Sequence, residues 1–248
     1  MPPETADPPP AAASPATEGQ KPAPAKTPIP GPLPSASIPT RPELSAEEQK
    51  KYDWLLEQCR AFTTVDCRHH GHNHKANKED KSGPITDSER LWLTRECLLR
   101  YLRATKWHEK DSERRLLETL AWRREFGVEA LTPDYISPEN ETGKQLIMGY
   151  DREGRPCHYL NPARQNTEAS HRQVEHLVFM LERVIDIMPA GQETLSLQIN
   201  FKQSKERKNT APGIAMAREV LHILQMHYPE RLGRSLIVNG TFRLMVCY

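Results

Sequence analysis

The stretch Cys67-Arg68-His69-His70-Gly71-His72-Asn73-His74 is the densest cluster of metal-ligating residue types in the sequence. Thiolate and imidazole are ligands that suit Zn²⁺, and four of them can close a tetrahedron. Structural zinc sites usually space two ligand pairs across a folded turn, whereas all of these residues share one short polar stretch. We therefore expect residues 66–84 to form a solvated His-rich loop, with weak or adventitious metal binding as the alternative.

A second cluster that could do chemistry is basic and consists of Lys202, Lys205, Arg207 and Lys208. A basic residue near an anionic lipid surface contributes about 1 kcal/mol of attraction, which makes this segment a candidate membrane contact. A solvated surface loop is the alternative interpretation.

The sequence lacks the motifs of common catalytic and nucleotide-binding folds. It has no Gly-x-Gly-x-x-Gly after a predicted strand, no Walker loop and no Gly-x-Ser-x-Gly elbow. No nucleophile stands near a base at a spacing that would pair the two. We therefore predict a protein that is not an enzyme, with no catalytic residues, no cofactor and no structural metal.

The N-terminal segment has a composition of its own. Most of the 22 prolines lie in the first 42 residues, among Ala, Ser and Thr and without any aromatic residue. Such a segment cannot bury enough apolar surface to offset the entropy lost on ordering. We expect residues 1–43 to be a disordered Pro-rich tail, with docking of Pro32-Leu33-Pro34 on an SH3 or WW domain as the alternative.

Charge and cysteine content exclude several functional classes. The formal net charge is +1, which argues against a nucleic-acid-binding surface. No apolar run reaches the length of about 18 residues that a membrane span needs, and the N-terminus lacks the pattern of a secretory signal. The five cysteines are odd in number and scattered, which is typical of a reducing compartment. We predict a cytoplasmic protein that binds no nucleic acid.

Apolar periodicity and capping patterns predict a helical first half and a mixed second half. Capping boxes at Ser45–Glu48 and Thr86–Glu89 begin two helices, the second of which continues to Leu102. A third helix is capped by Asp111 and ends at Gly127. The second half is expected to contain strands at 145–150, 157–160, 196–201 and 235–239 and helices at 171–188 and 214–227.

The helix over residues 171–188 has the clearest pattern. Ser170-His171-Arg172-Gln173 is read as its capping box. Its apolar face consists of Val174, Leu177, Val178, Leu181, Val184, Ile185 and Met188. The strand–helix–strand order over residues 196–239 predicts a βαβ unit, whose sheet normally needs further strands and covering helices. The predicted fold class is α/β (α+β layered), with helices followed by a mixed sheet.

Four motifs in this order resemble the CRAL-TRIO lipid-binding family. They are Leu98-Leu99-Arg100-Tyr101-Leu102-Arg103-Ala104-Thr105-Lys106-Trp107, Trp122-Arg123-Arg124-Glu125-Phe126-Gly127, Asp151-x-x-Gly154-Arg155-Pro156, and His227-Tyr228-Pro229-Glu230-Arg231-Leu232-Gly233-Arg234 with the strand that follows it. Tyr159-Leu160-Asn161-Pro162-x-x-Gln165-Asn166 resembles the drug-resistance-associated branch of the fungal phosphatidylinositol transfer proteins. The resemblance implies a helical CRAL-TRIO-N subdomain at 44–130 and a CRAL-TRIO lipid-binding domain at 131–248.

The resemblance implies a monomeric carrier of phospholipid, most simply phosphatidylinositol, that touches membranes transiently. Phosphatidylcholine and a sterol are further candidate ligands. Arg123 and Glu230 match the family's headgroup positions, where a cation would meet the phosphate and a carboxylate the inositol hydroxyls. The residues alone leave a plainer alternative: Arg123 is a surface helix residue, and Glu230 is a salt-bridge partner at a helix end.

The similarity to the family stops after Asn239. The family continues with a gating helix and a motif that supplies a Thr and a Lys to the inositol phosphate, whereas this sequence reads Gly240–Tyr248. We therefore expect the sequence to be a C-terminally truncated form of the lipid-binding domain. Two other functions stay open: a lipid-sensing regulatory or scaffold protein whose Pro-rich tail recruits a partner, and a truncated product without lipid-transfer activity.

Overall fold

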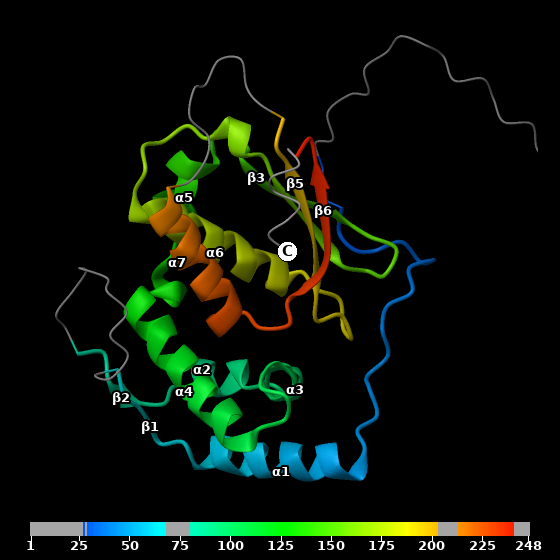
Figure 1. Cartoon of the computed structure of the whole chain (residues 1–248), viewed down its shortest axis with the longest axis vertical. Helices are drawn as coiled ribbons and strands as arrows, with labels where there is room; N and C mark the ends of the chain where they lie inside the picture. Colours follow the sequence, from blue (N-terminus) through cyan, green and yellow to red (C-terminus); the bar gives the residue numbers. More distant parts are fainter. Residues whose placement is uncertain (1–26, 28, 68–79, 203–212, 241–248) are drawn as a thin grey trace, which may run out of the picture.

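The computed structural model describes residues 27, 29–67, 80–202 and 213–240, arranged as a helical subdomain and a layer of helices on a sheet (Figure 1). The helical subdomain consists of α1 (Ala46–Ala61), α2 (Asp87–Trp92), α3 (Arg95–Ala104) and α4 (Glu109–Phe126). A short antiparallel pair, β1 (Thr64–Val65) and β2 (Gly83–Pro84), lies beside them. Their core is apolar and includes the fully buried Leu55, Leu98, Leu102, Leu116 and Leu120.

Local capping explains where these helices begin and end. The capping boxes predicted at Ser45 and Thr86 are both present, and Gly127 ends α4 with a φ of 79°. Two predictions are wrong. The second helix breaks before Thr94, whose side chain caps a separate α3, and α4 begins after His108 rather than at Asp111.

The second half folds into a four-stranded mixed sheet. Its strands are β3 (Gln145–Tyr150), β4 (Pro156–Leu160), β5 (Leu195–Asn200) and β6 (Leu232–Val238), which lie side by side in chain order. The β3–β4 hairpin is antiparallel, while β4–β5 and β5–β6 are parallel. The predicted fold class, helices followed by a mixed sheet, is confirmed.

Helices α5 (Pro133–Asn140), α6 (His171–Asp186) and α7 (Ile214–His227) lie on one side of the sheet, above the helical subdomain in Figure 1. Two short 3₁₀ helices, η1 (Val128–Ala130) and η2 (Pro162–Arg164), lie in the connections between the longer elements. The predicted apolar face of α6 packs in one core with residues of α7, β5 and the end of α4. Ser170 does precede α6, but its side chain makes no capping hydrogen bond, so the capping box predicted there is wrong.

The N-terminal segment differs from the prediction over residues 29–43. In Figure 1 this segment runs from the sheet down to α1. The Ser37 amide donates to the Arg152 carbonyl at 2.8 Å, and Arg41 pairs with Glu96 at 3.0 Å. The side chain of Ile38 lies against Gly154 in the β3–β4 turn. Apolar contact and backbone pairing thus hold a segment that its composition alone predicts to be disordered.

Two predicted loops fall mainly outside the described residues. Of the His-rich cluster only Cys67 is described, and its buried thiol lies 3.9 Å from the Ala121 carbonyl. Of the basic cluster only Lys202 is described, and it is exposed. Among the described residues, no helix has the length and apolar character needed to cross a bilayer.

Candidate functional site

A cavity of about 440 Å³ lies between α6, α7, β3 and β4. Its apolar wall includes Leu160 of β4, Leu177 of α6 and Met216 and Val220 of α7. The polar part of its lining, here the polar wall, consists of Lys144, Gln145, Gln165, Thr167, Gln173 and His176. The cavity therefore combines apolar surface with hydrogen-bonding groups.

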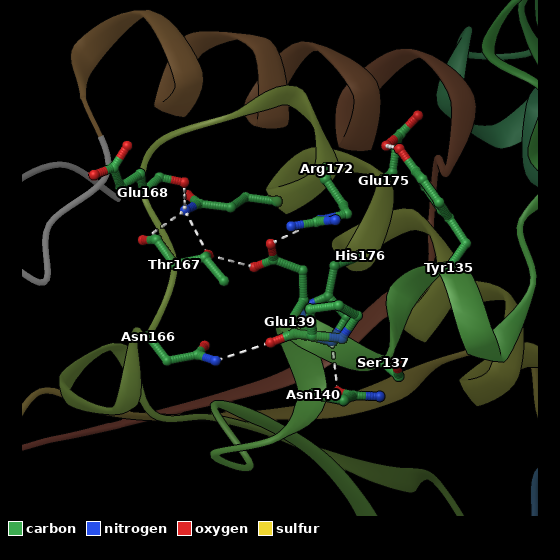
Figure 2. A network of polar contacts seen from close by, with 12 residues as sticks. Tyr135, Ser137, Glu139, Asn140, Asn166, Thr167, Glu168, Arg172, Glu175 and His176 are labelled. Atoms are coloured by element: carbon green, nitrogen blue, oxygen red, sulfur yellow. Dashed lines mark hydrogen bonds and ion pairs between the residues drawn. The ribbon is translucent and has the colours of Figure 1, made fainter.

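The carboxylate of Glu139 organises the polar wall (Figure 2). Glu139 is fully buried and accepts hydrogen bonds from Lys144, from the Thr167 hydroxyl at 2.7 Å and from Arg172 at 3.2 Å. Burial alone would raise the pKa of this carboxyl, but the hydrogen bonds from Lys144 and Thr167 outweigh it and hold the pKa below its ordinary value. The charge of Lys144 is thus neutralised within the wall.

A directed chain of hydrogen bonds continues the wall inward. Nε2 of His158 donates to the side-chain oxygen Oε1 of Gln145 at 3.0 Å, and the side-chain Nε2 of Gln145 donates to Nδ1 of His176 at 3.3 Å. Nε2 of His176 reaches the Asn140 side-chain oxygen at 2.6 Å, a contact drawn in Figure 2. Burial lowers the pKa of each histidine to about 4, helped for His158 by His176 and for His176 by Lys144. Both rings are therefore neutral near pH 7, and this series of hydrogen-bonded side chains carries no net charge.

The structure places Arg123 at the junction of the two halves of the protein and not in the 440 Å³ cavity. Its guanidinium is 8% exposed and donates to both oxygens of Glu182 on α6, at 2.9 and 3.1 Å, and to Glu129 at 2.6 Å. The Tyr228 hydroxyl donates to the same Glu182 at 2.6 Å. Burial would lower the pKa of Arg123, but the hydrogen bonds that it donates to Glu182 reverse the effect and raise the pKa.

Glu230 lies close to this junction along the chain, two residues after Tyr228. Its backbone has a φ of 59°, a left-handed conformation that is uncommon for a residue with a side chain. The side chain is exposed, and no hydrogen bond or ion pair reaches its carboxylate from the described residues. Arg123 and Glu230 do not touch. They are related through Tyr228, which contacts the carboxylate that Arg123 holds.

Sequence reasoning missed Glu182, although a signal for it exists. Glu182 follows Val178 by four residues and precedes Ile185 by three, so it lies on the apolar face of α6. A carboxylate on such a face needs a buried cation, which Arg123 supplies. Arg100 and Arg231 stand out in the sequence only as members of motifs. In the structure Arg100 is buried and Arg231 is half-buried, both near the same junction.

Family comparisons agree with this fold. The model described as CRAL/TRIO domain matches residues 140–247, and the model described as CRAL/TRIO, N-terminal domain matches residues 51–118. The chain belongs to the CRAL-TRIO family. Domains of this family carry lipids and are not enzymes, which confirms for the matched residues the prediction of lipid binding without catalysis.

Two of the similar proteins are fungal. The chain is 49% identical over 225 residues to a CRAL-TRIO domain-containing protein of Schizosaccharomyces pombe, covering 87% of this chain and 21% of that protein. It is 45% identical over 166 residues to phosphatidylinositol transfer protein PDR17 of Saccharomyces cerevisiae, covering 63% of this chain and 47% of the relative. The chain thus spans less than half the length of either protein.

A solved structure shows the same fold. The crystal structure of Sfh5 superposes with a TM-score of 0.52 at 14% sequence identity, covering 83% of this chain and 75% of the other. At this identity the likeness supports the architecture alone.

Proposed function

We propose that this chain binds phosphatidylinositol and that the protein containing it exchanges the lipid between membranes. The proposal rests on family membership and on the 45% identity to a protein named as a phosphatidylinositol transfer protein. Phosphatidylcholine and a sterol are the competing ligands that any test must separate. The carrier acts as a monomer in the cytoplasm and touches membranes only while lipid enters or leaves.

The cavity between α6, α7 and the sheet is the observation that carries this proposal. A lipid leaves a bilayer only into an apolar environment, since each methylene exposed to water costs about 0.8 kcal/mol. Met216 and Val220 supply such a surface on α7. The polar wall offers hydrogen bonds, but its charges are paired with one another, which suits the ester groups of a lipid better than a second ionic headgroup.

Arg123 and Glu230 are the proposed headgroup residues. The carboxylate of Glu230 is exposed and suited to accept hydrogen bonds from inositol hydroxyls. Arg123 would keep its two hydrogen bonds to Glu182 and exchange Glu129 for the lipid phosphate. Glu129 is the exchangeable partner because its side chain is 71% exposed, against 17% for Glu182.

Transfer between vesicles tests the proposal. Donor vesicles carry labelled phosphatidylinositol, phosphatidylcholine or sterol in separate experiments, and acceptor vesicles carry none. We expect the purified chain, and the longer protein that contains it, to accelerate phosphatidylinositol transfer above the protein-free rate. If the chain accelerates only the transfer of phosphatidylcholine or of sterol, that lipid replaces phosphatidylinositol as the proposed ligand. If the longer protein accelerates the transfer of none of the three lipids, the carrier function is contradicted.

A lipid-sensing scaffold is the second candidate function. It is favoured by the Pro-rich segment before α1, in which the side chain of Leu33 is 75% exposed between two prolines. Replacement of Pro32, Leu33 and Pro34 by serine removes this motif and keeps Ser37 and Ile38, which contact the β3–β4 turn. A pure carrier keeps full transfer activity and full cellular activity after this replacement, whereas a scaffold keeps transfer and loses the cellular activity.

A further inference from the structure

A second cavity, of about 260 Å³, lies where the helical subdomain meets α6 and the segment before β6. The helical subdomain contributes Trp92, Thr94 and Arg100 to its wall. The remaining wall consists of Glu182, Ile185, Asp186, His227, Tyr228 and Arg231. Two arginines therefore face one small space from opposite halves of the protein.

Neither arginine has a carboxylate partner among the described residues. Arg100 is only 3% exposed, and its Nη1 donates a hydrogen bond to the carbonyl oxygen of Pro229 at 3.4 Å. Arg231 donates from Nη1 to the Glu193 carbonyl at 2.9 Å. Nε of each side chain is buried and meets no acceptor in the described part of the chain. Buried charged donors of this kind are costly unless something pairs with them.

The carboxylates close to the cavity are already paired with other arginines. Glu182 is held by Arg123 through two hydrogen bonds. Asp186 pairs with Arg183 at 2.9 Å. The nearby Glu193 pairs with Arg103 at 2.6 Å. Each of these carboxylates is therefore engaged by another arginine, and in the described part of the chain none lies within ion-pair distance of Arg100 or Arg231.

Two further observations support an excess of positive potential. Burial lowers the pKa of Arg231 to about 10, and the like charge of Arg100 lowers it further. Arg231 therefore still carries its charge near pH 7. Thr94, which caps the N-terminal end of α3, also lines the cavity, and the positive end of the helix dipole adds to the same potential.

We propose that this cavity is a binding site for a phosphate group, held between the guanidinium groups of Arg100 and Arg231. Arginine forks match the oxygens of phosphate and bind them through charge-assisted hydrogen bonds. The phosphate can come from the headgroup of a bound phospholipid or from a soluble phosphate compound. The site does not depend on the proposed phosphatidylinositol function, although a headgroup source would place the lipid phosphate here rather than at Arg123.

Thermal unfolding of the lipid-free chain tests the site. The melting temperature is measured with increasing inorganic phosphate and, in parallel, with chloride at matched ionic strength. A ligand that binds only the folded state raises the melting temperature progressively with its concentration. We expect this rise with phosphate and not with chloride. Equal responses to the two anions, an adventitious ion effect only, overturn the proposal without the need for any variant.

Variants assign the effect to the two arginines. Arg231→Gln and Arg100→Gln each remove one charge and are expected to lose the phosphate-dependent shift. The matched control is Arg114→Gln, since Arg114 lies in the same subdomain and its side chain is 61% exposed. If the glutamine variants do not fold, Arg231→Lys is used instead, because lysine keeps the positive charge but lacks the paired N–H donors of the guanidinium. If the phosphate-dependent rise in melting temperature is unchanged in Arg231→Lys, recognition of phosphate by the guanidinium of Arg231 is overturned.

Lipid loading separates the two sources of phosphate. The chain is incubated with vesicles of phosphatidylcholine alone or of phosphatidylcholine and phosphatidylinositol in equal parts, then isolated and titrated again with phosphate. Loss of the phosphate response only after phosphatidylinositol loading identifies a headgroup source. A response that persists on lipid-loaded protein identifies a soluble source. Both outcomes support the site, and the phosphate titration stands even if phosphatidylinositol does not bind.

Discussion

The guanidinium of Arg123 on α4 forms two hydrogen bonds to the carboxylate of Glu182 on α6, at 2.9 and 3.1 Å. This pair joins the helical subdomain to the layer over the sheet. Tyr228 closes the arrangement from the segment before β6, because its hydroxyl donates to the same carboxylate at 2.6 Å. Three parts of the chain that are distant in sequence therefore share one buried charge pair, next to the cavity proposed to hold phosphate.

Glu182→Gln should destabilise the protein strongly. The substitution keeps the size of the side chain but leaves the buried Arg123 with only the 71% exposed Glu129 as a counter-charge, and breaking a buried pair in this way typically costs about 3–5 kcal/mol. The free energy of unfolding from urea denaturation measures the effect. The control is Glu118→Gln, because Glu118 pairs with a 61% exposed arginine on α4, and such surface pairs contribute about 0–1 kcal/mol. Similar small losses in both variants would show that the pair does not hold the two halves together.

Mild acid should destabilise the protein through His158 and His176. Their folded pKa of about 4 lies below the ordinary value of 6.5, so the unfolded chain binds more protons between these two values. Their contribution is fully present above pH 6.5 and is lost as pH falls toward 4, by about 3 kcal/mol for each histidine at most. Carboxylates such as Glu139, with lowered pKa, lose their contribution only at lower pH.

Urea denaturation between pH 7 and pH 4.5 measures this dependence, and His176→Gln supplies the comparison. Gln at this position keeps hydrogen-bonding capacity but does not titrate, so the pH dependence should become shallower. A wild-type stability that stays constant over this interval would contradict the assignment of two neutral buried histidines.

Glu230→Gln should lower selectivity for phosphatidylinositol without affecting stability. A hydrogen bond to a charged acceptor is worth about 1.5–3 kcal/mol, so loss of the carboxylate should weaken inositol binding roughly 10- to 100-fold. Binding of phosphatidylcholine should not change, because choline offers no hydroxyl to this residue. The unfolding free energy should stay within about 0.5 kcal/mol, since the carboxylate has no partner among the described residues. Unchanged selectivity would remove Glu230 from the proposed headgroup site.

Much of the architecture could be predicted because its causes are local. The capping boxes at Ser45 and Thr86 and the apolar face of α6 depend on residues within one or two helical turns. The break before α3 was missed because Thr94 interrupts an otherwise periodic pattern with a cap of its own. The packing of residues 29–43 was missed because it depends on a turn more than a hundred residues away.

The site was harder to predict than the fold. The motifs identified Arg123 and Glu230 as candidates. The spacing of residues in the sequence does not show that Arg123 is hydrogen-bonded to Glu182 or that Glu230 is exposed. The motifs contain several arginines, and the sequence does not show which of them has a carboxylate partner. That Arg100 and Arg231 lack such a partner in the described part of the chain, and that Nε of each has no acceptor there, is visible only in the three-dimensional structure.

Filling the 440 Å³ cavity between α6, α7, β3 and β4 should prevent the chain from taking up lipid. Val220 and Leu221 are adjacent on α7, yet Val220 lines the cavity, while Leu221 is 52% exposed and does not. Val220→Trp introduces a large ring into the space proposed for acyl chains and should abolish loading of phosphatidylinositol from vesicles. Leu221→Trp adds the same ring outside the cavity and should load like the wild type. Equal loading by the two variants would place the lipid elsewhere.

The most direct measurement is the native mass of the chain after incubation with vesicles that contain phosphatidylinositol, phosphatidylcholine and sterol together. Our account predicts one bound lipid per monomer, with the mass of phosphatidylinositol. A chain that emerges without lipid, or that carries phosphatidylcholine or sterol in preference, would contradict the proposal that this domain selects phosphatidylinositol.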